Sequence, residues 1–131
     1  VAGEVDCIGT DHAPHTLDEK RQDMLSAPFG IANIEVAFPL LVEALVQPGR
    51  MTLQALLHRF QHGPADVMGW DAPSLEPDSP ADLVLLNLND ARAVEPHTFL
   101  SKAKFSPWEG EALHGWPVQT WVGGRSVFER S

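Results

Sequence analysis

One short run of residues contains most of the polar chemistry of this sequence: Ile8-Gly9-Thr10-Asp11-His12-Ala13-Pro14-His15-Thr16. It places a carboxylate and two imidazoles around a rigid proline, directly after an apolar segment that includes Val5 and Cys7. Such a segment is typical of a buried strand, and the glycine ends it. We therefore expect a short strand over residues 5–8, with Asp11 just beyond its end. In barrels of alternating strands and helices, the active site lies at that end of the strands.

Length and charge limit the classes of protein to which the chain can belong. Its 131 residues suffice for one ordinary domain. A complete eight-stranded barrel typically needs about 250 residues, so a whole barrel is excluded. The 18 acidic and 9 basic residues give a formal net charge of −9, which argues against nucleic acid as a partner.

The composition also predicts a cytoplasmic protein with no membrane-spanning segment. No apolar run approaches the roughly 20 residues of a membrane helix, and the first residues lack the basic start of a secretion signal. The single cysteine, Cys7, lies in an apolar run and is expected to be a buried thiol in a reducing compartment. Because the chain begins without Met, almost directly on an apolar segment, we expect it to be a piece of a longer protein.

Helical signals follow a long loop. Residues 9–30 show no helical period, and loops of such length are usually functional or disordered. From residue 34 apolar side chains recur at helical spacing, and Pro39 either kinks this helix or lies in its first turn. Thr52 is a suitable N-cap for a second helix with one apolar face. Pro64 and Gly69 then bound a single short helical turn.

The last third of the chain is expected to be β-rich. Residues 71–80 hold three prolines and mark an exposed boundary. Residues 81–88 then read as a strand, and residues 118–122 and 126–128 as a hairpin around Gly123-Gly124, because paired glycines accept the positive φ of a tight turn. The tryptophans that gather here are assigned to packing: Trp108, Trp116 and Trp121.

Residue chemistry alone leaves the opening run open to several interpretations. Asp11 suits a divalent-metal ligand or a general base, and His12 and His15 suit further ligands, substrate donors or ordinary hydrogen-bonding residues. The alternative is a loop whose aspartate caps a turn and whose histidines bind backbone carbonyls. His58 and His62 have the spacing of metal ligands on a helix. No third ligand lies nearby in the sequence, so we expect His58 to flank the apolar face and His62 to lie near the helix end.

The opening run closely resembles the signature around the last barrel strand of dihydroorotases, within the amidohydrolase superfamily. After Glu19 and Lys20, the resemblance continues in order over Pro28-Phe29-Gly30-Ile31, Glu35, Pro39-Leu40, Gly63-Pro64-Ala65, Gly69, Ala81-Asp82-Leu83-Val84, Ser106-Pro107, Gly110, Leu113-His114-Gly115 and Thr120-Trp121-Val122-Gly123-Gly124. It implies an α/β fold. Residues 1–70 would be the C-terminal part of a (β/α)8 TIM barrel, with its last strand, active-site loop and terminal helices. Residues 71–131 would be a segment of a small β-rich, sandwich-like domain.

The resemblance also implies an activity, the reversible zinc-dependent cyclisation of N-carbamoyl-L-aspartate to dihydroorotate in pyrimidine biosynthesis. Asp11 would be catalytic and would ligate one zinc ion of a pair, taking the proton of the attacking hydroxide and passing it to the leaving nitrogen. His15 would bind the substrate carboxylate. The backbone at Pro28 and Gly30 would lie against the pyrimidine ring. The resemblance assigns no firm role to His12.

The sequence departs from the family in two residues and in the ligands it lacks. Asn33 stands where the family usually has Gly, and Asn tolerates left-handed backbone better than most residues. Gly63 stands where the family usually has Asn, which removes a side-chain hydrogen-bonding group. In the family a His-x-His pair, a carboxylated Lys and two further histidines follow earlier barrel strands, and the resemblance places none of those strands in this chain, which has no His-x-His. We therefore expect it to be inactive unless an N-terminal portion completes the barrel.

Partners and alternatives follow from the same resemblance. Besides a small-molecule substrate and the N-terminal portion of the same enzyme, the family admits a homodimer or a complex with aspartate transcarbamoylase. A non-catalytic subunit that scaffolds aspartate transcarbamoylase is one alternative, and retention of Asp11 and His15 argues against it. Another is a cyclic amidohydrolase acting on dihydropyrimidine, hydantoin or allantoin rings, which generally lacks a histidine at the position of His15. An unrelated soluble α/β domain is disfavoured by the ordered matches.

Overall fold

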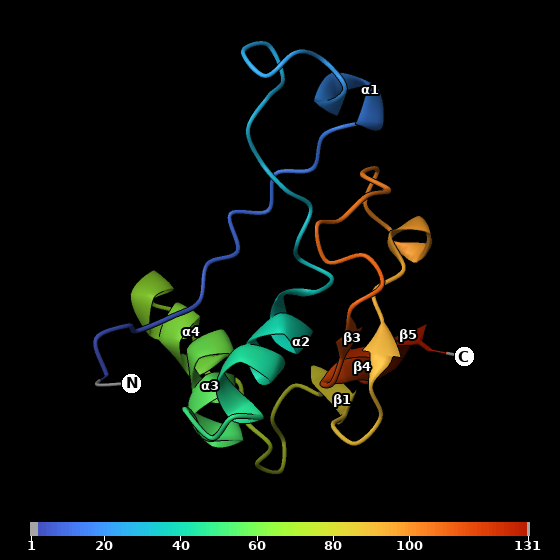
Figure 1. Ribbon diagram of the computed structural model, residues 1–131. Coiled ribbons are helices and arrows are strands. Elements are labelled where there is room, and N and C mark those ends of the chain that lie inside the picture. Colours follow the sequence, from blue (N-terminus) through green and yellow to red (C-terminus); the bar gives the residue numbers. More distant parts are fainter. Residues whose placement is uncertain (1–2, 131) are drawn as a thin grey trace.

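The structure is a computed structural model that describes residues 3–130. Figure 1 shows a long N-terminal excursion, the loop of residues 11–34, that projects from a group of helices. The strand-rich last third lies beside the helices. The helical elements are α1 (Leu17–Lys20), α2 (Ala37–Leu41), the π-helix η1 (Val42–Val46), α3 (Leu53–Phe60), α4 (His62–Met68) and the 3-10 helix η2 (Pro96–Thr98).

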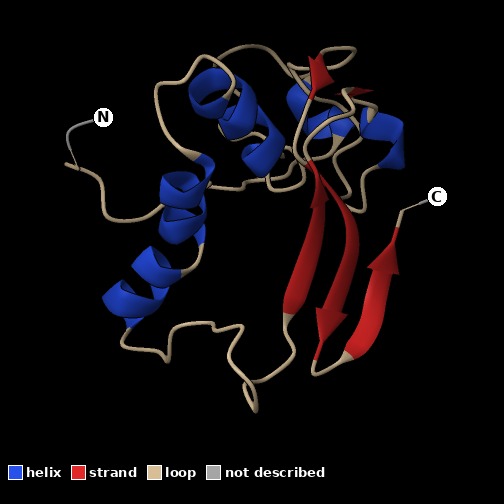
Figure 2. Cartoon of the chain, turned by 90° about the horizontal axis from the view of Figure 1, so that it is seen from below, coloured by secondary structure: helices blue, strands red, loops and turns tan. Residues whose placement is uncertain are grey.

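The strands form two small antiparallel sheets. They are β1 (Leu83–Asn87), β2 (Arg92–Ala93), β3 (Ala112–Leu113), β4 (Trp116–Val122) and β5 (Arg125–Glu129). The larger sheet has the order β1-β4-β5, and β2 pairs with β3 (Figure 2). Gly123 and Gly124 join β4 to β5 with φ values of 55° and 76°, which confirms the predicted hairpin and its turn chemistry.

The predicted start of α3 and end of α4, which depend only on neighbouring residues, are confirmed. Thr52 caps α3, because its hydroxyl accepts a hydrogen bond of 3.2 Å from the backbone N–H of Ala55. Gly69 ends α4 with a left-handed φ of 68°. Pro39 is the third residue of α2, which confirms the first-turn alternative over the kink. Directly after α2 the chain continues as η1, and the sequence analysis did not predict this π-helix.

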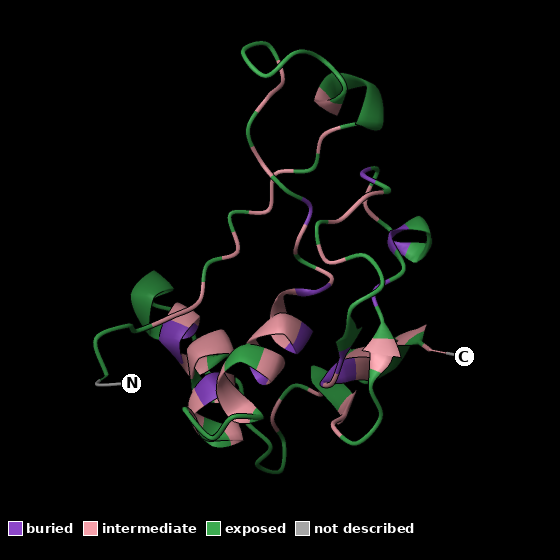
Figure 3. Cartoon of the chain, viewed as in Figure 1, coloured by how far each residue is buried: buried purple, intermediate pink, exposed green. Residues whose placement is uncertain are grey.

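The largest buried cluster joins the helical part of the chain to the strands. Val36, at the start of α2, is fully buried, and it packs with residues from the last third. The other buried members are Val94, Phe99, Leu113 and Trp116. Trp108 packs against this cluster, so Trp108 and Trp116 have the packing role predicted for them. Figure 3 shows buried residues in the helices, in the strands and also in the loops between them.

The structure corrects three expectations about residues 5–8, Cys7 and His62. Residues 5–8 form no strand, because no neighbouring strand among residues 3–130 offers backbone partners; the N–H of Ile8 instead donates to the carbonyl of Arg59 over 3.0 Å. Cys7 is partly exposed rather than buried for the same reason. His62 begins α4 instead of ending α3, since α4 is a seven-residue helix rather than a single turn.

One prediction about the rest of the chain is confirmed. Residues 71–80 are exposed except for Ser79, as expected for a connection between parts. Among the residues that the structure describes, none of the helices has the length and apolar character needed to cross a bilayer. The described fold is therefore a mixture of short helices and antiparallel strands.

Candidate active site

Asp11 adopts an unusual backbone conformation at the start of the long excursion. Its φ is 47°, in the left-handed region that residues other than glycine rarely occupy. The residue is exposed, and its carboxylate makes no hydrogen bond to another residue between 3 and 130. Asp11 thus presents a free anionic group from a constrained backbone. That combination is common at functional sites.

The segment after Asp11 is joined to residues 31–34 on the return arm of the excursion. The N–H of Ala13 donates to the carbonyl of Ile31 over 3.1 Å, and His12 forms an isolated parallel bridge with Ile31. The ring Nδ1 of His12 accepts hydrogen bonds from the backbone N–H groups of Asn33 and Ile34. The two arms of the excursion are therefore fixed to each other at its base (Figure 1).

His15 lies beside a short helix that begins with a capping box. The N–H of Thr16 donates to Glu19 over 2.7 Å, and the Thr16 hydroxyl accepts from the N–H of Glu19 over 3.3 Å. The hydrogen bond from the Thr16 backbone holds the pKa of Glu19 below its ordinary value. The Glu19 carboxylate also lies 3.7 Å from Nδ1 of His15. The polar partner on this side leaves Nε2 of His15 as the ring nitrogen available to a ligand.

Of the two predicted substrate contacts, Gly30 lies close to the same histidine, and Pro28 is bonded to α1. A Cβ atom added at Gly30 would lie 2.5 Å from Cβ of Ala13 and 3.5 Å from Cδ2 of His15. Gly30 has a φ of 119°, so both space and backbone require glycine. Lys20 of α1 donates from Nζ to the carbonyl of Pro28 over 2.6 Å. The structure therefore brings His15 and Gly30 together and links α1 to Pro28, on the loop that also holds Asp11.

The residues present fit one ligand position of a metal site. Asp11 offers an exposed, unpaired carboxylate, the kind of oxygen ligand that divalent zinc accepts. Among the described residues, no three His, Cys, Asp or Glu side chains gather closely enough to hold a metal ion. The rings of His58 and His62 stack with centroids 5.1 Å apart. Asp11 is thus one carboxylate suited to such a site, and a complete site would need further ligands.

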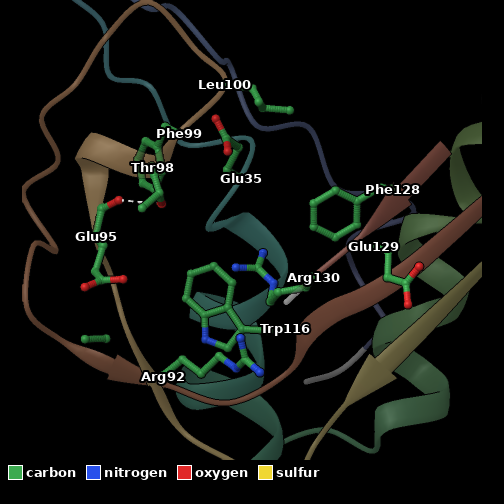
Figure 4. A pocket seen from close by; sticks show the side chains of 11 residues that line it. Glu35, Arg92, Glu95, Thr98, Phe99, Leu100, Trp116, Phe128, Glu129 and Arg130 are labelled. Atoms are coloured by element: carbon green, nitrogen blue, oxygen red, sulfur yellow. Dashed lines mark hydrogen bonds between the residues drawn. The ribbon is translucent and has the colours of Figure 1, made fainter.

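A cavity lined in part by Trp116 and Arg130 is separate from the Asp11 loop. Figure 4 shows this cavity of about 540 Å³ around Trp116, where the Arg130 guanidinium lies 5.1 Å from the Trp116 ring centroid. Burial, and then the nearby Arg92, lower the pKa of Arg130. Three glutamates also line it: Glu35, Glu95 and Glu129. The walls carry both signs of charge and none of the residues predicted for the active site.

Sequence reasoning missed two features of the site, one of which had a readable signal. The pattern Thr16-Leu17-Asp18-Glu19 is a capping-box sequence, and it identifies α1 inside what was expected to be an irregular loop. The contacts of His12 with residues 33–34 join positions 21 and 22 residues apart. No local pattern signals such a pairing, so it needed the structure.

Comparison with known proteins agrees with the sequence resemblance. The chain is 51% identical to a dihydroorotase of Deinococcus radiodurans and 44% identical to a dihydroorotase of Bacillus cytotoxicus, over 128 residues in each case. By sequence, this chain belongs to the dihydroorotase family. Each match covers 98% of this chain, which spans about 30% of the length of these relatives. No family model matches the chain.

Solved structures place the fold of this dihydroorotase-family chain among cyclic amidohydrolases. It matches an L-hydantoinase (dihydropyrimidinase) from Arthrobacter aurescens with a TM-score of 0.88 and 31% identity, covering 98% of this chain and 30% of that one. A D-hydantoinase matches with a TM-score of 0.85 at 22% identity, covering 98% of this chain and 29% of that one, and it supports the fold alone. The arrangement of short helices and strands is therefore shared with a segment of these enzymes.

Proposed function

We propose that this chain is part of a dihydroorotase, which interconverts N-carbamoyl-L-aspartate and dihydroorotate. The observation that carries the proposal is the 51% identity to a dihydroorotase along nearly the whole chain. The loop geometry supports it, because His15 and Gly30 lie together on the loop that presents Asp11. In this proposal residues 1–70 are the last strand, active-site loop and terminal helices of a TIM barrel, and residues 71–131 belong to a small β-rich domain.

Asp11 is the proposed catalytic residue and metal ligand. A zinc pair, when bound, lowers the pKa of water and polarises the amide carbonyl. The Asp11 carboxylate takes the proton of the attacking water and delivers it to the ring nitrogen as the carbon–nitrogen bond breaks. Its freedom from hydrogen bonds to other described residues leaves the carboxylate available for both tasks.

His15, Pro28 and Gly30 are the proposed substrate-binding residues. An imidazole N–H at His15 donates a hydrogen bond to the exocyclic carboxylate of dihydroorotate. At Gly30 the absence of a side chain lets the backbone lie against Ala13 and His15, and in this proposal the same backbone approaches the dihydropyrimidine ring. The carboxylate contact is the one that distinguishes dihydroorotate from neutral cyclic amides.

The proposed partner is the N-terminal portion of the same enzyme, which supplies the remaining zinc ligands and the other barrel strands. Two observations support it: the chain spans about 30% of its relatives' length, and Val5 and Cys7 are partly exposed where a buried strand was expected. A cytoplasmic location belongs to the same proposal and is supported by the single free cysteine.

The second candidate is a hydantoinase-type activity, which the fold match to the Arthrobacter aurescens enzyme favours. The test joins this chain to the N-terminal portion of the Deinococcus radiodurans relative, and we call this chimaera the complete enzyme. We expect zinc-dependent turnover of dihydroorotate, little turnover of hydantoin or dihydrouracil, and nearly complete loss of turnover in Asp11→Asn. Preferred turnover of a neutral ring would support the second candidate. A folded, zinc-loaded enzyme without any turnover would support a non-catalytic scaffold.

A further inference from the structure

Two backbone N–H groups converge on one nitrogen of His12, the residue after Asp11. Nδ1 accepts a hydrogen bond of 3.1 Å from Asn33 and another of 3.1 Å from Ile34. A ring nitrogen that accepts carries no proton, so the His12 ring is the neutral tautomer with its proton on Nε2. His12 is half-buried, and its ring is held by backbone rather than by mobile side chains.

The residue before Asp11 is held from the same short segment. Nδ2 of Asn33 donates to the carbonyl of Thr10 over 2.6 Å. The other amide atom of Asn33, Oδ1, is buried and has no hydrogen-bond partner among the described residues. The bond to Thr10 is therefore the contact that orients this side chain.

Asp11 lies between these two anchored neighbours with its left-handed φ of 47°. Left-handed backbone costs aspartate less than most residues but is still unfavourable, and it persists where the surroundings enforce it. Segment 33–34 is joined to the core, because the N–H of Val36, which is fully buried, donates to the carbonyl of Asn33 over 3.0 Å. The hydrogen bonds on both sides thus fix the backbone from which the Asp11 carboxylate projects.

We propose that His12 and Asn33 are positioning residues that hold Asp11 in its left-handed conformation and so aim its carboxylate for proton transfer. The proposal rests on the proposed function and assigns His12 a role that the resemblance left open. It also changes the explanation for Asn33. Its φ is not positive, so tolerance of left-handed backbone is not the reason for Asn at this position. Its side chain adds a bond to Thr10 that a glycine lacks.

Two substitutions at His12, made in the complete enzyme, test the roles of its two ring nitrogens separately. His12→Asn keeps an acceptor, Oδ1, near the place of Nδ1, whereas His12→Gln keeps a polar group near Nε2 and withdraws the acceptor. Because displacing a catalytic group by about 1 Å can cost up to about 100-fold in rate, we expect His12→Gln to lower kcat about 10- to 100-fold with KM for dihydroorotate nearly unchanged. We expect His12→Asn to restore kcat to within about threefold of the unsubstituted enzyme.

Asn33→Gly provides a second variant that removes the bond to Thr10 and leaves the His12 ring unchanged, and we expect kcat to fall about tenfold. Thermal denaturation shows which variants are folded, and only those are compared in the kinetics. An unchanged kcat in both His12→Gln and Asn33→Gly would overturn the proposal, as would a His12→Asn enzyme as slow as His12→Gln. A rise in KM in place of the fall in kcat would also overturn it. Asp11→Asn separates the two proposals, because an active Asp11→Asn enzyme rejects the proposed function itself.

Discussion

Glu43 accepts hydrogen bonds from both the backbone and the ring of His114, a residue 71 positions further along the chain. The bond from the His114 backbone N–H measures 2.9 Å, and the second joins the same carboxylate oxygen to Nδ1 of the ring. Next to this pair, a Cβ atom added at Gly115 would lie 2.8 Å from Cγ2 of Val42. One π-helix and one turn between strands are thus joined by hydrogen bonds and close packing.

The Glu43 contact predicts loss of stability in acid. The hydrogen bond from the His114 ring holds the pKa of Glu43 below its ordinary value of 4.5. A pKa lowered by folding means that the stabilisation is complete above pH 4.5 and is lost as the pH falls through the folded-state value. We expect Glu43→Gln to lower the free energy of unfolding at pH 7 by about 1–2 kcal/mol and to weaken this acid dependence.

Urea denaturation of the complete enzyme between pH 3 and 7 measures this effect, with Glu109→Gln as the control. Glu109 is an exposed glutamate whose side chain bonds to no other described residue. An unchanged acid dependence in Glu43→Gln would contradict the role of the Glu43–His114 pair.

At Gly30 we expect the addition of one methyl group to lower both stability and activity. In Gly30→Ala the new Cβ would lie 2.5 Å from Cβ of Ala13, and the φ of 119° would be strained for alanine. We expect a loss of about 1–3 kcal/mol in stability and at least about a tenfold loss in kcat/KM. Gly9→Ala is the control, because a Cβ there meets open space, and it should change stability by less than about 0.5 kcal/mol. Similar kinetics for the two variants would refute the close approach.

At Gly63 we expect asparagine, the residue that the family usually has there, to destabilise the fold. A Cβ atom at Gly63 would lie 2.2 Å from the carbonyl oxygen of Asp6, a backbone atom that cannot turn away. We expect Gly63→Ala to destabilise by about 1–3 kcal/mol although alanine favours the helix, and Gly63→Asn to do the same or more. Asp66→Ala, at an exposed position of α4, should be nearly neutral in thermal denaturation. A stabilised Gly63→Asn would show that the segment around Asp6 moves aside.

Lys20 predicts an effect on substrate binding without an effect on the chemical step. Its ammonium donates to the Pro28 carbonyl over 2.6 Å and so links α1 to the proposed binding backbone. Removing a hydrogen bond worth about 1 kcal/mol, Lys20→Met should raise KM for dihydroorotate about 3- to 10-fold and leave kcat within about twofold. Lys102→Met, at an exposed lysine, serves as the control. A fall in kcat alone would contradict this assignment.

Local signals in the sequence predicted local structure well. Thr52, Gly69 and the glycine pair at 123–124 act within a few residues of themselves, through a cap or a positive φ, and each did so in the structure. Pro39 allowed either a kink or a place in the first turn of a helix. The structure has it in the first turn of α2, where Val36 and Pro39 are buried.

Features that depend on distant partners could not be predicted from the sequence. A strand over residues 5–8 requires neighbouring strands, and residues 3–130 contain none for it. The contacts of Asn33 with Thr10 and of Glu43 with His114 are set by tertiary packing. For the site, residue identities and the family resemblance named Asp11, His15, Pro28 and Gly30. The structure added how the loop holds His15 and Gly30, while the chemical roles stay predictions.

The π-helix η1 restricts how the length of this chain can vary. In its wide turn the N–H of Gln47 donates to the carbonyl of Val42, five residues back, over 2.9 Å. Deleting one residue would restore an ordinary helix and rotate the following positions by about 100° relative to those before. The Glu43–His114 contact and the packing of Val42 on Gly115 would then fall out of register. Insertions and deletions among homologues should therefore gather in the exposed segment 71–80 and avoid residues 42–46.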